Sequence, residues 1–213
     1  MEFTVAIDGP AAAGKGTLAK RIARHFGFKH LDTGTLYRAV GLKALEQGRG
    51  IITAKAAAHL AERLAAHDMT RHDLRGPMAS RAASKVAAMP EVREALMSFQ
   101  RSFARQEGGA VLDGRDIGTV ICPEAEVKLF VTASDAVRAK RRHTELAKSD
   151  TKMTLSEVKR DLASRDARDS GRMSAPLAMA SDAVLLDTTD LSIEAAVAEA
   201  IALTEERLES VRS

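Results

Sequence analysis

The stretch that most constrains the fold runs from Phe3 to Thr17 and reads FTVAIDGPAAAGKGT. Its first residues form an apolar pattern that is typical of a strand. Glycines and a lysine then follow at the spacing G-x-x-x-x-G-K, and apolar residues recur at helical spacing between Leu18 and Phe26. The order of strand, glycine-rich loop and helix is the context that a phosphate-binding loop requires. Backbone N–H groups and the positive end of the helix would converge there on an anion.

Lys15 in this loop supplies a positive charge for the β- and γ-phosphates of a nucleotide. The strict pattern has Ser or Thr directly after the lysine, but Gly16 intervenes here, so Thr17 must supply the hydroxyl. Gly16 also permits a second phosphate-bearing substrate to approach the backbone closely. The alternative is an ordinary glycine-rich turn, but the lysine, the spacing and the flanking elements favour the phosphate loop.

Apolar segments of strand type recur along the chain, and helical patterns separate them. The expected strands cover residues 3–7, 28–32, 110–113, 127–131 and 183–187. This alternation predicts an α/β fold with a doubly wound, mostly parallel, five-stranded sheet and helices on both faces. Ligands bind such sheets outside the carboxyl ends of the strands. The turns that begin at Asp8, Asp32, Asp113 and Asp187 should therefore converge on one site.

The region between the second and third expected strands is predicted to be helical with one polar interruption. Residues 53–70 are rich in Ala and read as a helix, and residues 82–89 and 91–106 read as two more. The segment 71–80 is polar and contains Gly-Pro, a turn signal, so we expect a surface loop there.

Composition narrows the classes of function. Aromatic residues make up 3% of the 213 residues and Trp is absent, which argues against stacking platforms for single-stranded nucleic acid. The net charge of +3 is too small to imply DNA binding. Cys122 is the only cysteine, which excludes an internal disulfide and a cysteine-based zinc site. No apolar run reaches membrane-spanning length and no leader pattern is visible, so we expect one cytoplasmic, monomeric domain without membrane or nucleic-acid partners.

Arginines outside the loop are candidate ligands for further phosphate groups. Arg38 lies in the first turn of an expected helix, where a cation opposes the helix dipole. Arg165, Arg168 and Arg172 are spaced to share one helix face, where three cations repel one another unless an anion lies between them. Neutralisation by the interleaved aspartates is the alternative. The basic run at residues 138–142, taken alone, favours a solvated helix face.

The chain resembles the cytidylate kinases (CMP/dCMP kinases), a family in the nucleoside monophosphate kinase group. The stretches that carry the resemblance are IDGPAAAGKGTLAK, LDTGTLYRAVG, RAASKVAAMPEVREAL, DGRDIGTVICPEAEVKLFVTAS, SRDARDSGR and APLAMASDAVLLDTT. They cover nearly the whole chain in the family's order, and the G-K-G-T form of the loop is typical of the group. The resemblance implies that the γ-phosphoryl group of ATP, bound with Mg²⁺, is transferred to CMP or dCMP, giving CDP or dCDP and ADP.

The resemblance also implies roles for individual residues. The expected ATP site comprises Gly9, Pro10, Ala11, Ala12, Ala13, Gly14, Lys15, Gly16, Thr17 and Arg138. The expected CMP site comprises Thr33, Arg38, Ser84, Arg93, Arg115, Asp116, Arg165, Asp169 and Arg172. The residues expected to act in catalysis are Lys15, Arg115, Arg142 and Arg172. Mg²⁺ would be held largely through ATP, with Thr17 as the protein ligand.

Within the CMP site the resemblance divides the residues by the part of the nucleotide that they contact. It assigns Arg38, Arg115 and Arg172 to the phosphate, Ser84, Arg93 and Asp116 to cytosine, and Arg165 and Asp169 to the sugar. The exocyclic amine of cytosine is a donor, so the carboxylate of Asp116 can accept from it. Uracil would present a carbonyl oxygen to the same carboxylate, and that mismatch should reduce its use as a substrate.

The family implies a single kinase domain with two substrate-specific parts. The expected core comprises residues 1–36, 107–145 and 180–213, the NMP-binding region residues 37–106, and the lid residues 146–175. Many bacterial relatives insert a small antiparallel sheet in the NMP-binding region, but residues 71–80 are too few for three strands. We therefore expect a small helical insert, which leaves open how strongly UMP is rejected.

Several alternatives share the phosphate loop. An adenylate, uridylate, UMP/CMP or shikimate-type kinase would keep the loop but would not need Ser84, Arg93 and Asp116 together. A GTP-binding switch would need a guanine-reading N-K-x-D or T-K-x-D motif, and the sequence contains none. The preference between CMP and dCMP stays open, as does the carboxylate that organises Mg²⁺, which is either Asp8 or Asp113.

Overall fold

The computed structural model describes residues 1–148 and 152–212; residues 149–151, in the expected lid, and residue 213 lie outside the described residues. Within this part of the chain, the strands are β1 (Thr4–Asp8), β2 (Lys29–Asp32), β3 (Ala110–Asp113), β4 (Val127–Thr132) and β5 (Val184–Asp187). They form one sheet in the order β2-β3-β1-β4-β5, in which every neighbouring pair is parallel. The predicted doubly wound parallel sheet is confirmed.

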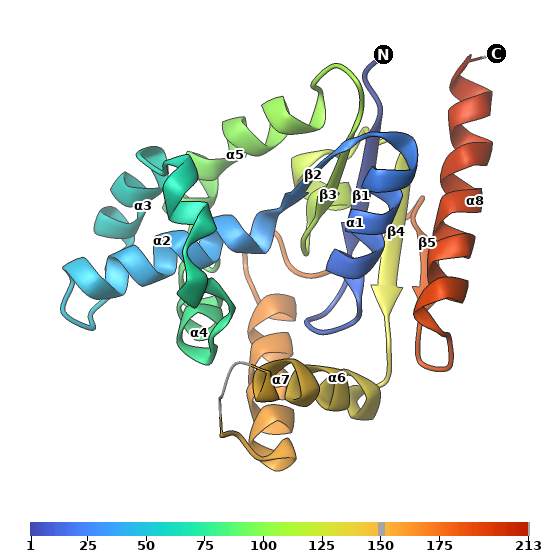
Figure 1. The fold of residues 1–213 in the computed structure, drawn as a ribbon. Helices are drawn as coiled ribbons and strands as arrows, with labels where there is room; N and C mark the ends of the chain where they lie inside the picture. The colour runs from blue at the N-terminus through green and yellow to red at the C-terminus, as the bar shows by residue number, and fades with distance from the viewer. Residues whose placement is uncertain (149–151, 213) are drawn as a thin grey trace.

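Helices cover both faces of this sheet (Figure 1). They are α1 (Lys15–Phe26), α2 (Thr33–Gln47), α3 (Ala54–Glu62), α4 (Pro77–Val86), α5 (Pro90–Ala104), α6 (Asp135–Ala147), α7 (Leu155–Ser170) and α8 (Ile193–Arg212). In the central strand β1, Val5 and Ile7 pack in the cluster that includes α1 and α8, whereas Ala6 packs in the cluster of α2 to α5. Successive residues of a strand point to opposite faces, so β1 is buried on both sides.

Helices α6 and α7 pack against the phosphate loop through a smaller apolar cluster. Ala11 of the loop packs with Ala139 and Leu146 of α6 and with Val158 and Leu162 of α7. Figure 1 shows these two helices beyond the carboxyl end of β4. The cluster therefore joins the carboxyl edge of the sheet to part of the expected lid. No helix among the described residues is long and apolar enough to cross a membrane.

The segment 53–80 differs from the sequence prediction. Helix α3 ends at Glu62, and a separate 3₁₀ turn, η1 (Ala66–Thr70), follows it. The buried carboxylate of Asp68 fixes this break, because it accepts from the N–H of Ala65 at 3.0 Å and from Nζ of Lys43 at 2.7 Å. The single long helix predicted over residues 53–70 is therefore wrong.

The predicted loop over residues 71–80 is also wrong. It contains a second 3₁₀ turn, η2 (His72–Arg75), and the first residues of α4. Leu74 of η2 is buried against Ala39, Leu42 and Ala79. Pro77 is the first residue of α4, where its missing N–H costs no helical hydrogen bond. In the described part of the chain, residues 37–106 contain helices and no strand, in agreement with the expected helical insert.

Helix α7 begins as its sequence predicts. Thr154 and Glu157 form the predicted capping box, in which the Glu157 N–H donates to Thr154 Oγ1 at 3.2 Å and the Thr154 N–H donates to Glu157 Oε2 at 2.8 Å. The helix ends at Ser170, so Arg172 lies beyond it, and the exposed Arg168 donates to the carbonyl oxygen of Ser164. The three arginines that we expected on one helix face therefore have three different environments.

Gly41 sets the close approach of α2 and α4. A Cβ at this position would lie 2.7 Å from the carbonyl carbon of Ala82 and 2.9 Å from the nitrogen of Ala83. We expect Gly41→Ala to lower the free energy of unfolding by about 1–3 kcal/mol, because overpacking forces the two backbones apart. Urea denaturation measures the change. Gly76→Ala is the matched control, since its Cβ would meet only Asp73 O at 3.4 Å, and equal stability of the two variants would contradict this packing.

Candidate active site

The loop from Gly9 to Thr17 has the backbone geometry of a phosphate-binding loop. Gly9 has φ +138°, and a Cβ there would lie 1.9 Å from the carbonyl oxygen of Val131, so only glycine fits. Gly14, with φ +103°, precedes α1, and no side chain caps this end of the helix. The first turn of α1 also carries no acidic residue. Its positive end is therefore available to an anion.

Lys15 is buried at the base of this loop. Its Nζ donates to the carbonyl oxygen of Pro10 at 2.7 Å. Burial lowers the pKa of Lys15 well below its ordinary value, and the charges of Arg115 and Arg165 lower it further. An anion in the loop would oppose both effects and favour the ammonium form.

The two aspartates at the ends of neighbouring strands have different surroundings. Both oxygens of Asp8 accept backbone N–H groups, from Ile117 at 2.8 Å and Gly118 at 2.7 Å, and burial raises its pKa to about 6. Oδ1 of Asp113 lies 2.7 Å from His30 Nε2. Its Oδ2 faces Gly16, and a Cβ added to Gly16 would lie 3.8 Å from this oxygen. Asp8 thus fixes the turn η3 (Ile117–Ile121), whereas Asp113 faces the phosphate loop.

A group of arginines faces this loop around one buried carboxylate. Asp169 accepts from Arg115 Nε at 2.9 Å and also forms an ion pair with Arg172. Burial would raise the pKa of Asp169, but the charges of Arg115, Arg172 and Arg165 hold it below its ordinary value. Burial and the charge of Arg115 lower the pKa of Arg165 to about 9. One carboxylate therefore offsets the charge of several arginines only in part.

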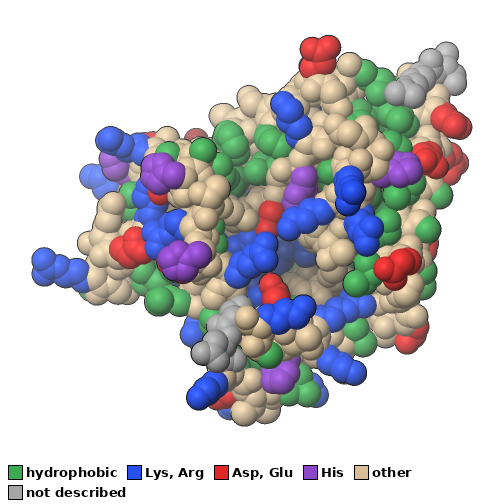
Figure 2. All heavy atoms as spheres, viewed as in Figure 1, with side chains coloured by type: hydrophobic (Ala, Val, Ile, Leu, Met, Phe, Trp, Pro, Cys, Tyr) green, Lys and Arg blue, Asp and Glu red, His purple; other side chains and the backbone are tan. Residues whose placement is uncertain are grey.

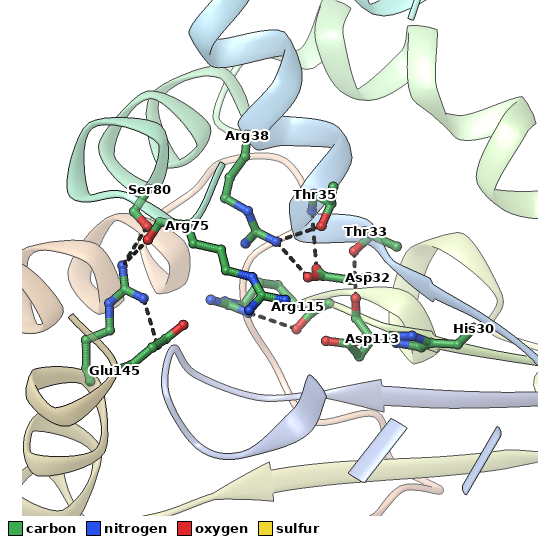
Figure 3. A network of polar contacts seen from close by, with 12 residues as sticks. His30, Asp32, Thr33, Thr35, Arg38, Arg75, Ser80, Asp113, Arg115 and Glu145 are labelled. Carbon is green, nitrogen blue, oxygen red and sulfur yellow. Dashed lines mark hydrogen bonds and ion pairs between the residues drawn. The ribbon is translucent and has the colours of Figure 1, made fainter. Parts of the chain in front are cut away.

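The first two turns of α2 carry another part of the site (Figure 3). Arg38 donates to Asp32 Oδ2 at 2.6 Å and to Thr35 Oγ1 at 2.7 Å. Thr33 donates through Oγ1 to the carbonyl oxygen of Asp113 at 2.9 Å. The carboxyl ends of β2 and β3 are joined in this way, as the predicted convergence of strand ends requires.

Arg93 and Asp116 form a buried ion pair, and Arg93 Nη1 also lies 3.4 Å from Tyr37 Oη. Both charged residues are at most 5% exposed. Burial raises the pKa of Asp116, although the charges of Arg93 and Arg172 oppose that effect. Two of the three expected cytosine-reading residues are thus in direct contact. The third, Ser84, is buried on α4, and its Oγ has no hydrogen-bond partner among the described residues.

Buried polar side-chain atoms without a partner are concentrated in the expected CMP site. Among the described residues they are Arg38 Nε, Ser84 Oγ, Thr119 Oγ1, Arg165 Nε, Asp166 Oδ1 and Arg172 Nε. Four of these six atoms belong to residues that the family resemblance assigned to CMP. Such atoms cost free energy unless something binds them, so their grouping is typical of a site that is completed by a polar ligand.

The basic run on α6 is not the solvated face that its sequence alone favours. Arg138 donates to the carbonyl oxygen of Ala11 at 3.1 Å and pairs with Asp166 of α7 at 2.7 Å. Arg142 instead donates to Ser80 Oγ at 3.1 Å and to the carbonyl oxygen of Arg75 at 3.3 Å. Arg138 therefore contacts the phosphate loop, whereas Arg142 joins α6 to η2 and α4.

Sequence analysis gave no individual role to Arg141 or Thr188. Arg141 donates to Ala13 O of the loop at 3.3 Å and to both Oγ1 and the carbonyl oxygen of Thr188, at 2.9 and 2.8 Å. Thr188 Oγ1 lies 3.1 Å from the same carbonyl oxygen of Ala13. The available signals were the basic run and the Asp-Thr-Thr turn after the last strand, but neither reveals this long-range contact.

Lys and Arg side chains line the hollow in the centre of the face shown in Figure 2, with few acidic side chains between them. The same view shows acidic side chains mainly at the edges of the molecule. Within the described residues, no group of three or more His, Cys, Asp and Glu side chains could hold a metal ion. The hollow is thus suited to anionic ligands.

Comparisons with known proteins agree with this geometry. Residues 5–206 match the family model for cytidylate kinase. The chain is 61% identical over 207 residues to a protein of Cereibacter sphaeroides strain KD131 named cytidylate kinase, with 97% of each chain covered. It is 53% identical over 209 residues to one of Methylocella silvestris (98% of this chain and 97% of the other), and 50% identical over 208 residues to one of Rhizobium meliloti (98% of each), both of the same name.

Solved structures support the fold. The chain is similar to an uncharacterized protein from Eubacterium ventriosum, with a TM-score of 0.57 and 12% identity over 95% of this chain and 98% of the other. It is also similar to a gluconokinase from Sinorhizobium meliloti, with a TM-score of 0.51 and 15% identity over 99% and 96%. On the family match and the 50–61% identities together, the chain belongs to the cytidylate kinase family.

Proposed function

We propose that the protein transfers the γ-phosphoryl group of ATP to CMP or dCMP and releases ADP with CDP or dCDP. The observation that carries this proposal is the set of unpartnered buried atoms, Arg38 Nε, Ser84 Oγ, Arg165 Nε and Arg172 Nε, beside a phosphate-binding loop. A nucleoside monophosphate offers acceptors for all of them. Membership of the cytidylate kinase family identifies cytosine as the base.

The donor nucleotide binds the loop from Gly9 to Thr17. Backbone N–H groups and the end of α1 bind its phosphates, and Lys15 is charged once they are present. Arg138 and Arg141 hold the loop from α6 through the carbonyl oxygens of Ala11 and Ala13. Thr17 and Asp113 are the residues that would hold a Mg²⁺ ion bound with ATP, and the ion would neutralise charge on the phosphates. Asp8 is the weaker candidate because both of its oxygens already accept N–H groups.

The acceptor nucleotide lies between α2, α4 and the arginine group. Asp116 accepts a hydrogen bond from the exocyclic amine of cytosine, while Arg93 and Ser84 donate hydrogen bonds to its acceptors N3 and O2. Arg38, Arg115 and Arg172 bind the phosphate, and Arg165 with Asp169 bind the sugar. Thr33 orders the turn beside Asp113. Uracil would place a carbonyl oxygen against the carboxylate of Asp116, which would leave a buried acceptor unpaired.

The reaction needs positioning and charge stabilisation more than a general base. The attacking phosphate oxygen is already ionised, so no side chain has to remove a proton. Lys15, Arg115, Arg142 and Arg172 stabilise the charge that develops on the transferred group. Residues 37–106 form the NMP-binding region and residues 146–175 the lid, which closes over both substrates and excludes water.

Turnover with four nucleotides tests the assignment. A coupled assay of ADP release with ATP·Mg²⁺ and CMP, dCMP, UMP or AMP should give fast turnover with CMP and dCMP and little with AMP. UMP turnover close to that of CMP would contradict selection by Asp116. Absence of turnover with all four nucleotides would refute the proposed reaction.

Replacement of Lys15 separates catalysis from folding. Lys15→Ala should reduce kcat with CMP by at least about 100-fold, because it removes a charge that acts on the transferred phosphoryl group. The free energy of unfolding should not fall, since the ammonium is costly to bury. Lys20→Ala, an exposed position on the same helix, is the control and should keep wild-type activity. Activity of Lys15→Ala within a few-fold of wild type would contradict the role of the loop.

Replacement of Ser84 should have opposite effects on stability and function. Ser84→Ala removes a buried hydroxyl that has no hydrogen-bond partner among the described residues, so the free energy of unfolding should stay equal or rise by up to about 1 kcal/mol. The KM for CMP should rise by about tenfold, the value of one lost hydrogen bond to the base. Urea denaturation and steady-state kinetics measure the two effects, with the exposed Ser102→Ala on α5 as control. A destabilised variant with an unchanged KM would show that Ser84 serves packing alone.

A further inference from the structure

Arg75 is an arginine of the cleft to which sequence analysis gave no role. It is the last residue of η2, in the segment that the sequence predicted as a loop. The residue is exposed in the unliganded protein. Figure 3 shows its side chain extending from η2 toward Arg115. Arg75 therefore reaches the arginine group from the side that carries α4.

The backbone of η2 fixes this direction. Leu74 is 4% exposed and packs against Ala39 and Leu42 of α2, which anchors the turn to the NMP-binding region. The carbonyl oxygen of Arg75 accepts from Arg142 Nη2 at 3.3 Å. Because the side chain of Leu74 is buried and the carbonyl of Arg75 itself is bound from α6, Arg75 is held at the edge of the cleft. Its direction does not depend on an interaction of its own guanidinium.

The charge of Arg75 has no counterpart within the described residues. Its guanidinium forms no hydrogen bond or ion pair with any residue that the structure describes. Arg71 in the same short segment is different, since it forms ion pairs with both Glu46 and Asp73. Arg115, toward which Arg75 points, already shares Asp169 with Arg172. Like charges that face each other without an anion are unfavourable, so this arrangement is suited to a dianion between Arg75 and Arg115.

We propose that Arg75 is a further catalytic residue: together with Arg115 it binds the phosphate of the acceptor nucleotide during phosphoryl transfer. The proposal rests on the proposed function, which supplies the dianion. Arg75 comes from the NMP-binding side and Lys15 from the phosphate loop, so the acceptor phosphate and the transferred group are bound from two elements of the fold. The fork of a guanidinium suits a phosphate better than the point charge of a lysine does.

Kinetics of Arg75→Ala and Arg75→Lys give the first test. We expect Arg75→Ala to lower kcat/KM for CMP by about 100-fold, which is the usual effect of removing one donor to developing charge, and to leave KM for ATP within twofold. Arg75→Lys should retain intermediate activity. Arg81→Ala, an exposed arginine on α4, is the matched control and should behave as wild type. The free energy of unfolding of Arg75→Ala, measured by urea denaturation, should equal that of the wild type. If Arg75→Ala folds poorly, Arg75→Gln takes its place in the comparison.

Binding of inorganic phosphate gives a second test that does not need turnover. Isothermal titration of phosphate into the ADP-saturated protein should show binding about tenfold weaker in Arg75→Ala, the effect of one lost charged hydrogen bond. Turnover of Arg75→Ala within threefold of wild type, or unchanged phosphate binding, would overturn the role of Arg75. Failure of the wild type to phosphorylate CMP would refute the proposed function instead, and the phosphate comparison would still decide the role of Arg75.

Discussion

The carboxylate of Asp169 is the interaction on which the arrangement of the arginines depends. It pairs with Arg115 from the turn after β3 and with Arg172 from beyond α7, so it joins the central sheet to the end of the expected lid. The surrounding cations hold its pKa below the ordinary value despite burial. Asp169 therefore stays ionised at neutral pH and fixes two arginines that would otherwise repel each other.

Asp169 offsets only part of the positive charge of the arginines around it. The remaining positive charge makes the site suitable for an anionic ligand. Burial lowers the pKa of Lys15 and of Arg165, and the charge of Arg115 lowers both further, so further positive charge in the cleft is unfavourable. Substrate phosphates would reverse that preference. Unfavourable burial of charge is tolerated in a folded protein where ligand binding compensates for it. The buried Nε atoms of Arg38 and Arg172, which have no partner among the described residues, lie in the same region.

Local sequence patterns predicted the phosphate loop, the strands and the parallel sheet, because each depends on residues that are close together in the chain. The family motifs supplied the candidate site residues, but no local pattern could pair Arg93 with Asp116, which are 23 positions apart. Arg141 was missed for the same reason, since its partner Ala13 is 128 positions away. The predicted loop over residues 71–80 failed because burial of Leu74 and the start of α4 at Pro77 outweighed its polar composition.

The close contact at Gly41 has a consequence for how substrate recognition is organised. With no side chain between them, α2 and α4 touch through their backbones near Ala82 and Ala83. Arg38 lies on α2 and Ser84 on α4. We expect the two helices to move together, which would fix the distance between Arg38, the proposed phosphate ligand, and Ser84, the proposed base ligand. With those proposed roles, the pair of helices would match the length of a nucleoside monophosphate, and a ligand with the correct base but a longer or shorter phosphate arm would not reach both residues.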